Sequence, residues 1–364
     1  MSNSAAYEDS GVPLIHRSLP LRAASDGCDG KAADGEAGWT PAEHRQRSQG
    51  GHRESRSRHG SVDSGIRVRV PAKINLALMV GRQRSDQYHE LATLFQAVSL
   101  YDDITASSSS DGITCEVLGA EAHKIGVGDD NLAVRAAKLL QETYGITEGV
   151  HLVIDKRIPV AGGMAGGSAD AAGALLACAR FWELRIPVNE LMELGAQLGA
   201  DVPFPLMGGC AVGLGRGESL TPALCRGVFH WVLAFSTSHL STPEVFRRFD
   251  EITAPHSIPA IPQVSQELMM ALISGDLDRV GELLLNDLSQ ASCSLLPELH
   301  TTLRAGREAG CLGAIISGSG PTIAFLTKSE SAAADLGVTL SSLGIARDIR
   351  LVTGPVGGAH FLED

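Results

Sequence analysis

The stretch Pro-Val-Ala-Gly-Gly-Met-Ala-Gly-Gly-Ser-Ala-Asp-Ala-Ala, residues 159–172, places Gly162, Gly163, Gly166 and Gly167 directly before an alanine-rich segment. Glycine has no Cβ, so such a backbone can adopt positive φ and bring successive N–H groups close to a phosphate. The helix predicted after the glycines adds unpaired N–H groups and the positive end of its dipole. Residues 151–155 alternate as a strand does. The predicted order is strand, loop, helix, which is typical of nucleotide-binding loops.

The glycine loop nevertheless differs from two common nucleotide motifs. It is not a Walker A motif, because Ser168 stands where the lysine is required, and it is not a dinucleotide fingerprint. Four glycines also suit a tight strand-to-helix turn with close packing. The glycine spacing alone therefore leaves phosphate binding and close packing open.

Composition narrows the class of protein. The chain has 364 residues, of which 44% are hydrophobic and 20% charged, as in a globular protein of two domains. No run approaches the ~18 consecutive apolar residues of a membrane span, and the first thirty residues lack the apolar stretch of a signal peptide. We therefore expect a cytoplasmic protein with no membrane partner. The net charge of −12 argues against nucleic acid as a partner.

The seven cysteines are scattered and never form Cys-x-x-Cys, which indicates reduced thiols rather than a zinc site or a disulfide framework. Residues 1–65 are polar and aperiodic, and we expect them to be disordered and dispensable for catalysis. A transit peptide is the alternative for this tail, opposed by its acidic residues. Its cluster of Arg53, Arg56 and Arg58 suits a solvated tail better than a contact with RNA or membrane.

Regular structure is expected from Ile66 onward, in a first domain of residues 66–222 and a second of residues 223–364. The first is predicted to open with one bent strand or two short ones in 66–80, followed by a strand pair, 103–107 with 113–117. Asn131 is expected to cap a helix that ends at Gly145. Further helices are predicted at 168–182 and 189–198, and a buried strand at 210–214. The second domain is predicted to be α+β, with strands at 229–235, 313–317, 322–326 and 347–352 and helices at 243–249, 264–274, 277–287, 297–308 and 329–343.

Three reactive side chains stand where the backbone is expected to turn. Lys73 follows Pro71-Ala72, His89 follows Asp86-Gln87-Tyr88, and Asp201 lies in Gly-Ala-Asp-Val-Pro. A kinase that phosphorylates an alcohol needs a group that takes the hydroxyl proton and positive charge near the γ-phosphoryl group. Each side chain also has an ordinary interpretation, as an exposed cation, a loop histidine or a carboxylate at a helix end.

Taken together, the motifs resemble the GHMP kinase superfamily. They are Pro-Ala-Lys-Ile-Asn-Leu at 71–76, the glycine loop, and Gly-Ser-Gly-Pro at 318–321. Within it, the likeness is greatest to the family of 4-diphosphocytidyl-2-C-methyl-D-erythritol kinases and covers Ile66 to the C-terminus. Its specific motifs are Tyr-His-Glu-Leu at 88–91, Asp-Asn-Leu at 130–132, Asp-Lys-Arg-Ile-Pro at 155–159 and Gly-Ala-Asp-Val-Pro-Phe at 199–204. The resemblance implies an α+β, two-lobed GHMP kinase fold, with a split β-α-β unit in the N-terminal lobe and a ferredoxin-like C-terminal lobe.

The resemblance also implies an activity, the ATP-dependent phosphorylation of the 2-hydroxyl of 4-diphosphocytidyl-2-C-methyl-D-erythritol in the non-mevalonate (methylerythritol phosphate) pathway of isoprenoid biosynthesis. Asp201 would be the base, and Lys73 would hold Asp201 and lower the pKa of the hydroxyl. ATP would be the co-substrate and Mg²⁺ the cofactor. Ser168 is a candidate ligand for phosphate or Mg²⁺, and no other metal ligand is assigned.

The remaining site residues follow from the same resemblance. The ATP site would comprise Asn131 and Lys156 beside the adenosine and Pro159, Gly162, Gly163, Gly166, Gly167 and Ser168 around the phosphates. The substrate site would comprise Tyr88, His89 and Phe246 around the cytosine, with Asn75 and Thr242. Two departures from the family pattern stand out: Gln87 replaces a glycine before Tyr88, and in the phosphate motif Ala165 replaces a glycine and Ala169-Asp170 a Ser-Asn pair.

Two other functions remain open at this point. The chain could be another GHMP kinase, such as a homoserine or mevalonate kinase, although those lack the nucleobase clamp that Tyr88-His89 suggests. It could also be a GHMP-fold protein that binds a ligand without chemistry, as sugar-sensing regulators do. The intact Lys73 and Asp201 count against that second function.

Overall fold

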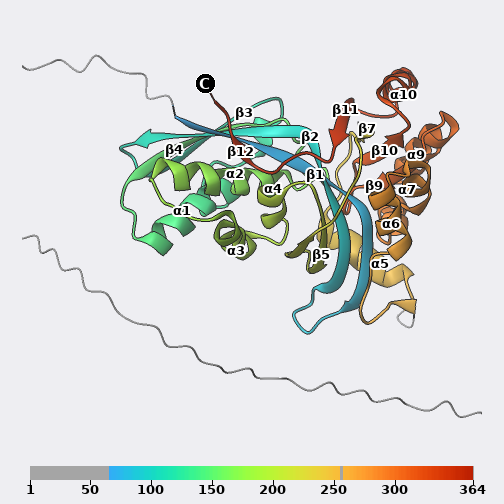
Figure 1. Cartoon of the computed structure of the whole chain (residues 1–364), viewed down its shortest axis with the longest axis horizontal. Helices are drawn as coiled ribbons and strands as arrows, with labels where there is room; N and C mark the ends of the chain where they lie inside the picture. Colours follow the sequence, from blue (N-terminus) through green and yellow to red (C-terminus); the bar gives the residue numbers. More distant parts are fainter. Residues whose placement is uncertain (1–64, 255–256, 364) are drawn as a thin grey trace, which may run out of the picture. The chain divides into compact units, whose positions relative to one another are not determined.

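The computed structural model describes residues 65–254 and 257–363. The expectations for the N-terminal tail, including its arginine cluster, fall on residues 1–64 and lie outside the described residues. The described chain forms two sheets, one of 8 strands and one of 4, each covered by helices (Figure 1). The expected α+β, two-lobed fold class is confirmed.

Two long antiparallel strands, β1 (Ile66–Gln83) and β2 (His89–Ser109), form the centre of the first sheet. The opening segment is thus one strand, whose register shifts after Pro71 and again after Asn75. A shift at Pro71 is expected because proline has no N–H to donate to the ladder. Residues 91–99, for which no strand was predicted, belong to β2, and residues 91–96 pair with both β1 and β5 (Cys210–Gly215).

The predicted pairing of residues 103–107 with residues 113–117 is wrong. The strand β4 (Gly149–Asp155) lies between β2 and β3 (Ile113–Leu118), antiparallel to the first and parallel to the second. The chain leaves β3 and returns as β4 through the helix α1 (Leu132–Tyr144). The short separation of β2 and β3 in the sequence favours a hairpin between them. In the structure, however, β4 lies between these two strands, so β4 has a hydrogen-bonding neighbour on each side and its alternate residues are buried.

Helices cover one face of this sheet, as Figure 1 shows for α1, α2 (Gly166–Phe181), α3 (Val188–Leu198) and α4 (Pro203–Met207). The predicted caps of α1 are confirmed: the Asn131 side chain accepts a hydrogen bond from the N–H of Ala133, and Gly145 takes the left-handed conformation. A Cβ on Gly173 would lie 2.5 Å from Ile104 Cγ1, so glycine lets α2 approach the strands closely. A 3₁₀ turn, η1 (Ala122–Lys124), precedes α1.

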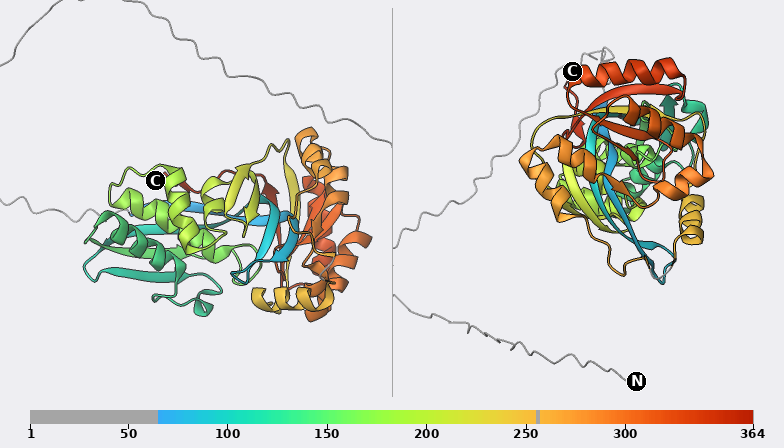
Figure 2. Two further views of the ribbon diagram at one scale, coloured as in Figure 1. Left: turned by 90° about the horizontal axis from the view of Figure 1, so that it is seen from below. Right: turned by 90° about the vertical axis from the view of Figure 1, so that its right-hand side faces the viewer.

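The second sheet has the order β11-β7-β10-β9, all antiparallel, from β7 (Phe229–Phe235), β9 (Gly313–Ile316), β10 (Ile323–Thr327) and β11 (Asp348–Gly354). With α9 (Glu298–Glu308) and α10 (Glu330–Leu343) between its strands, the order is that of a ferredoxin-like lobe. Figure 2 shows the orange and red helices gathered on the side of this sheet that faces away from the blue β1. The predicted strands and helices of this lobe are present with small shifts at their ends.

The other helices here are α5 (Thr242–Ile252), α6 (Gln266–Ser274), α7 (Leu277–Leu283) and α8 (Ser289–Leu295). The helix predicted at 277–287 ends at Leu283, because β8 (Leu285–Asn286) pairs with β1. The short elements α4, α8, β6 (Ser219–Pro222), β8 and β12 (His360–Phe361) were not predicted, since periodicity needs longer segments.

Two of these strands, β8 and β12, return to β1 from residues far beyond 222. The division into domains at residues 222 and 223 remains a proposal. No helix within the described ranges is long and apolar enough to cross a membrane.

Candidate active site

A cavity of about 1110 Å³ collects residues from both lobes. It contains most of the predicted site residues: Lys73, Asn75, Tyr88, His89, Gly162, Gly163, Gly166, Gly167, Ser168, Asp201, Thr242 and Phe246. A second cavity, of about 290 Å³, contains Asn131 and Lys156. The two cavities share Leu132, Ala161 and Gly167, and Pro159 lines neither. Residues far apart in sequence thus come together as two adjoining hollows beside the glycine loop.

Lys73 is buried on β1, and several groups hold its ammonium in place. Nζ donates to Asn75 Oδ1 at 2.8 Å and to the carbonyl of Gly163 at 3.2 Å, and it lies 5.2 Å from the centre of the Phe95 ring. The nearest carboxylate oxygen, Oδ2 of Asp201, is 3.8 Å away. Burial lowers the pKa of Lys73, and the charge of Asp201 opposes that shift. The lysine therefore joins β1, the glycine loop and Asp201.

Asn75 is oriented in turn by Thr93 on the neighbouring strand. Its Nδ2 donates to Thr93 Oγ1 at 2.8 Å, and that hydroxyl donates to the carbonyl of Ala77 at 2.8 Å. With its amide nitrogen engaged in this way, Asn75 must turn its oxygen toward Lys73. The relay fixes the position of the ammonium. Thr93 was not predicted, and only the pairing of β1 with β2 reveals it.

Asp201 lies in the turn between α3 and α4, as the position of Pro203 indicated. Pro203 is the first residue of α4, where its missing N–H is not needed. The side chain of Asp201 is 35% exposed and that of Lys73 only 5%. The carboxylate is therefore the member of the pair that an incoming ligand can reach.

The glycine loop ends in unpaired N–H groups at the start of α2. The first backbone bond of the helix runs from the N–H of Ala169 to the carbonyl of Ala165, and no side chain caps the helix. The N–H groups of Gly166, Gly167 and Ser168 precede that bond, and all three residues line the large cavity. This arrangement, with the positive end of the helix dipole, suits an anion such as a phosphate.

The C-terminal Gly-Ser-Gly-Pro motif packs directly on the glycine loop. Ser317 Oγ donates to the carbonyl of Gly163 at 3.0 Å, and the N–H of Thr322 donates to the carbonyl of Gly162 at 3.4 Å. Gly163 has φ +76°, and a Cβ there would lie 2.1 Å from the carbonyl oxygen of Ser317. Asn286 of β8 supports the motif from behind through the carbonyls of Ile316 and Gly318. The second lobe therefore holds the loop of the first in shape.

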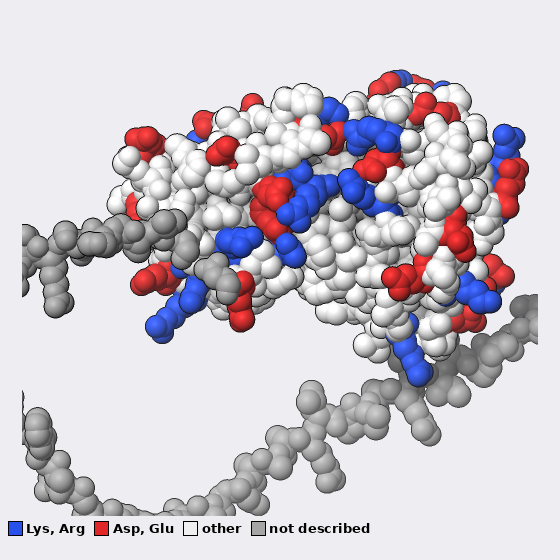
Figure 3. Space-filling model, turned by 90° about the horizontal axis from the view of Figure 1, so that it is seen from above, with Lys and Arg blue, Asp and Glu red and all other residues white. Residues whose placement is uncertain are grey.

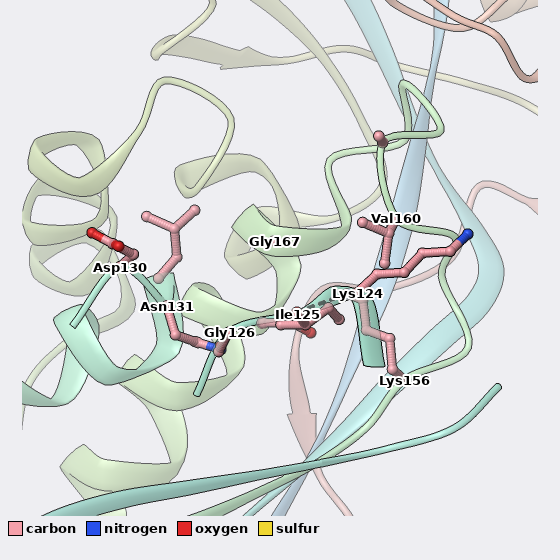
Figure 4. A pocket seen from close by; sticks show the side chains of 11 residues that line it. Lys124, Ile125, Gly126, Asp130, Asn131, Lys156, Val160 and Gly167 are labelled. Carbon is pink, nitrogen blue, oxygen red and sulfur yellow. Dashed lines mark hydrogen bonds and ion pairs between the residues drawn. The ribbon is translucent and has the colours of Figure 1, made fainter. Parts of the chain in front are cut away.

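Figure 4 shows the smaller cavity, with Asn131 and Gly126 joined by a hydrogen bond from Asn131 Nδ2 to the Gly126 carbonyl. Across from them are Lys124, Val160 and Lys156. Glu121 organises this rim, because its carboxylate accepts from Lys124 Nζ at 2.7 Å and from the N–H of Val160 at 2.9 Å, and it also pairs with Arg347. Glu121 was not predicted as a site residue.

Lys156 belongs to a buried charge cluster that the sequence did not reveal. Its Nζ donates at 2.7 Å both to Asp102 on β2 and to Asp170 on α2. Asp102 also accepts from the N–H groups of Arg157 and Ile158. Burial raises the pKa of Asp170, and Lys156 offsets this only in part. Two carboxyl groups share one ammonium, so a proton on Asp170 makes the cluster neutral.

Tyr88, which also lines the large cavity, is 57% exposed, and the guanidinium of Arg216 lies 5.3 Å from the centre of its ring. Thr242 Oγ1 lies 2.8 Å from Ser319 Oγ, linking the start of α5 to the Gly-Ser-Gly-Pro motif. His89 stacks on Phe246, with 5.2 Å between the ring centres. The predicted nucleobase residues therefore gather at one place. Arg216 and Ser319 are additions that only the structure reveals.

Charged side chains of both signs are interspersed on the face drawn in Figure 3, without a broad basic stripe. Nucleic-acid binding relies on clustered positive charge. This face agrees with the acidic net charge of the chain.

Comparison with known proteins places these features in a family. The model for the N-terminal domain of GHMP kinases matches residues 131–209, and the model for the C-terminal domain matches residues 268–345. A 4-diphosphocytidyl-2-C-methyl-D-erythritol kinase of Mycolicibacterium smegmatis is 50% identical over 299 residues, covering 82% of this chain and 92% of that relative.

Solved structures agree. The crystal structure of a 4-(cytidine 5'-diphospho)-2C-methyl-D-erythritol kinase has a TM-score of 0.66 and 32% identity, covering 80% of this chain and 100% of that chain. A homoserine kinase from Cytophaga hutchinsonii also has a TM-score of 0.66, over 83% of this chain and 99% of that chain, but at 18% identity it shares only the fold. By its sequence identity over most of its length, this chain belongs to the 4-diphosphocytidyl-2-C-methyl-D-erythritol kinase family of the GHMP kinases.

Proposed function

We propose that this chain transfers the γ-phosphoryl group of ATP to the 2-hydroxyl of 4-diphosphocytidyl-2-C-methyl-D-erythritol, a step of the methylerythritol phosphate pathway. One observation carries the proposal. A single cavity contains the glycine loop, the Lys73–Asp201 pair and the aromatic group of Tyr88, His89 and Phe246. A substrate with a cytosine at one end and a reacting hydroxyl at the other can therefore reach both the base clamp and the phosphoryl donor.

Asp201 acts as the general base. As the 2-hydroxyl oxygen attacks the γ-phosphorus, its proton passes to the Asp201 carboxylate, and the bond from the γ-phosphorus to the bridging oxygen breaks to release ADP. The exposure of Asp201, beside a buried lysine, supports this assignment.

Lys73 positions Asp201 and stabilises negative charge near the reacting oxygen. Two of its ammonium protons are directed to Asn75 and Gly163, and the third remains for Asp201 or the substrate oxygen. A fixed positive charge in a buried site stabilises the developing alkoxide more strongly than one in water.

The N–H groups of Gly166, Gly167 and Ser168 hold the phosphates of ATP, and the adenosine occupies the smaller cavity beside Asn131 and Lys156. No cluster of three or more His, Cys, Asp or Glu side chains suited to a metal occurs in residues 65–254 and 257–363. Mg²⁺ in kinases is held largely by phosphates and water, with few protein ligands. The Ser168 hydroxyl, next to the phosphate-binding amides, fits such a ligand, and Mg²⁺ there would neutralise phosphate charge.

An ADP-release assay with three acceptors tests the proposal. The chain is incubated with ATP and Mg²⁺ and with 4-diphosphocytidyl-2-C-methyl-D-erythritol, homoserine or mevalonate. We expect ADP release with the first acceptor only. Mass spectrometry of the product should show one added phosphate.

Release with homoserine or mevalonate instead would assign the chain to another GHMP activity. Binding of ATP and substrate without ADP release would favour a protein that binds but does not catalyse. The Asp201→Asn variant is the matched control, because it keeps the size of the side chain and removes the base.

A further inference from the structure

We propose that Asp250 determines which pyrimidine the enzyme accepts, by fixing the tautomer of His89 so that its Nδ1 accepts a hydrogen bond from the amino group of cytosine. This inference rests on the proposed function, in which His89 lies beside the cytosine in the base clamp. Asp250 acts through His89 and is therefore a positioning residue.

His89 is held from three sides. Its ring stacks on Phe246 at 5.2 Å between centres and 21° between planes, and it meets the edge of Phe249 at 6.1 Å and 90°. Its Nε2 lies 2.9 Å from Oδ1 of Asp250. The side chain is only 5% exposed. The ring therefore has one defined orientation.

All three of these contacts come from one helix. Phe246, Phe249 and Asp250 lie on α5, at the i, i+3 and i+4 positions that share a helix face. His89 is the first residue of β2, at the end of the loop that carries Tyr88. The same helix face thus supplies both the stacking surface and the hydrogen-bond partner of the histidine.

The second ring nitrogen, Nδ1, is the one left for a ligand in the large cavity. His89 lines that cavity, and within the described residues Nδ1 has no hydrogen-bond partner. Nor is it among the buried polar atoms left without a partner, which in the described part of the chain are Asp170 Oδ1 and Trp182 Nε1. Nδ1 is therefore accessible to a ligand.

The carboxylate decides what Nδ1 can do. An ionised carboxylate only accepts hydrogen bonds, so Nε2 must carry the proton that it donates to Asp250. In a neutral imidazole the other nitrogen is then an acceptor with a free lone pair. The contact at Nε2 therefore makes Nδ1 an acceptor.

An acceptor at this place distinguishes the two pyrimidines. Cytosine presents an amino donor where uracil presents a carbonyl acceptor. Nδ1 can accept a hydrogen bond from the amino group of cytosine. Opposite uracil, the lone pair of Nδ1 instead meets a lone pair of the carbonyl oxygen, and the two repel each other. Stacking on Tyr88 or Phe246 does not distinguish the bases, because both have similar ring faces. Selectivity thus depends on the tautomer, and the tautomer on Asp250.

The test compares the cytidine substrate with its uridine analogue. We measure kcat/KM for both compounds with the unaltered chain and with Asp250→Asn, Asp250→Ala and Glu251→Gln. Glu251 is the matched control: it neighbours Asp250 on α5, loses the same charge on substitution, and pairs with Arg247 and Arg248 rather than His89. Selective ¹⁵N labelling of histidine, with His89→Ala to assign the signal, reports the tautomer directly.

We expect the unaltered chain and Glu251→Gln to prefer the cytidine compound by roughly ten-fold or more, which is ~1.4 kcal/mol per decade. In Asp250→Asn the amide N–H can donate to Nε2, which moves the imidazole proton to Nδ1. The preference should then fall several-fold, with the uridine analogue improving. Asp250→Ala should lower the preference for the cytidine compound, because without the carboxylate no contact favours one tautomer of His89 over the other. The NMR signal of the unaltered chain should show the proton on Nε2.

An unchanged preference in both Asp250 variants overturns the inference, as does a proton on Nδ1 in the unaltered chain. If the unaltered chain phosphorylates neither compound, the proposed function fails, and the tautomer measured by NMR then decides this inference by itself.

Discussion

Lys73 Nζ lies 2.8 Å from Oδ1 of Asn75 but 3.8 Å from Oδ2 of Asp201. The ammonium is therefore anchored by a neutral amide and directed toward the carboxylate without a tight ion pair. The contacts with Asn75 and Gly163 therefore set where the ammonium lies beside Asp201.

The first prediction concerns this pair. Asp201→Asn should still bind ATP but lose phosphoryl transfer by about 10²–10⁴-fold, the usual contribution of general-base catalysis. Adding Lys73→Met should cost little more, because residues that act as a unit are not additive. Single-turnover rates of both single variants and the double variant provide the measurement. Near-normal turnover by Asp201→Asn, or losses that simply add, would contradict the assignment.

The second prediction concerns the contact between the two lobes. Gly163→Ala places a Cβ 2.1 Å from the carbonyl oxygen of Ser317 and should displace the glycine loop. Gly145→Ala is the control, since its φ of +67° is similar and nothing lies within 4 Å of the added Cβ. The control should lose only about 1–2 kcal/mol of stability. Gly163→Ala should lose more and also raise the KM for ATP; equal effects in both variants would show that the contact with Ser317 is unimportant.

The third prediction concerns the two departures from the family pattern. Gln87 has φ 68° and Ala165 has φ 58°, so both occupy the left-handed region where a glycine is expected. The strain is about 1–2 kcal/mol for each residue, offset in part by the greater freedom that glycine has in the unfolded chain. Gln87→Gly and Ala165→Gly should each raise the free energy of unfolding by up to about 1 kcal/mol. Urea denaturation measures this free energy. A clear loss of stability in either variant would show that the replaced residue is not strained.

The fourth prediction concerns acid stability. Burial raises the pKa of Glu121, but hydrogen bonds from Lys124, the Val160 N–H and Arg347 outweigh it and lower the pKa to about 2. Because the folded pKa is depressed, the stabilisation is full above the unfolded value near 4.5 and is lost as pH falls toward about 2. Glu121→Gln should cost about 1–2 kcal/mol at neutral pH.

Thermal unfolding between pH 7 and pH 3 checks this. The difference in melting temperature between the unaltered chain and Glu121→Gln should become smaller as the pH falls. Glu308→Gln, which removes an exposed carboxylate on α9, should show little effect at any pH. If the difference in melting temperature between Glu121→Gln and the unaltered chain did not change with pH, the charge of Glu121 would not contribute to stability.

The fifth prediction concerns Tyr88, whose ring is exposed and has Arg216 against it. Stacking between a base and an aromatic ring contributes about 0.5–1.5 kcal/mol and is insensitive to which pyrimidine is present. Tyr88→Ala should therefore raise KM for the cytidine and uridine compounds alike, whereas His89→Ala should narrow the difference between them. A change in the preference between the cytidine and uridine compounds in Tyr88→Ala would mean that Tyr88, rather than His89, distinguishes the two bases.

Local patterns predicted much of the fold. The helix α1 begins after Asn131 and ends at Gly145, as expected, because a side-chain cap and a left-handed glycine depend on a few neighbouring residues. The strand, glycine loop and helix around Gly162 also follow from local backbone preferences. The family motifs named the site residues, and all of those except Pro159 line the two cavities. Their individual roles remain predictions.

The sequence by itself determined the family, the class of fold and the position of the glycine loop, because these depend on composition, periodicity and motifs of a few residues. Only the tertiary structure decided that β4 separates β2 from β3, that Lys156 lies between Asp102 and Asp170, and that Asp250 contacts His89. His89 and Asp250 are 161 residues apart, and each belongs to a segment with no local sign of the other. Such contacts form when burial of two apolar surfaces brings distant segments together, and no short-range preference records which polar side chains will then meet.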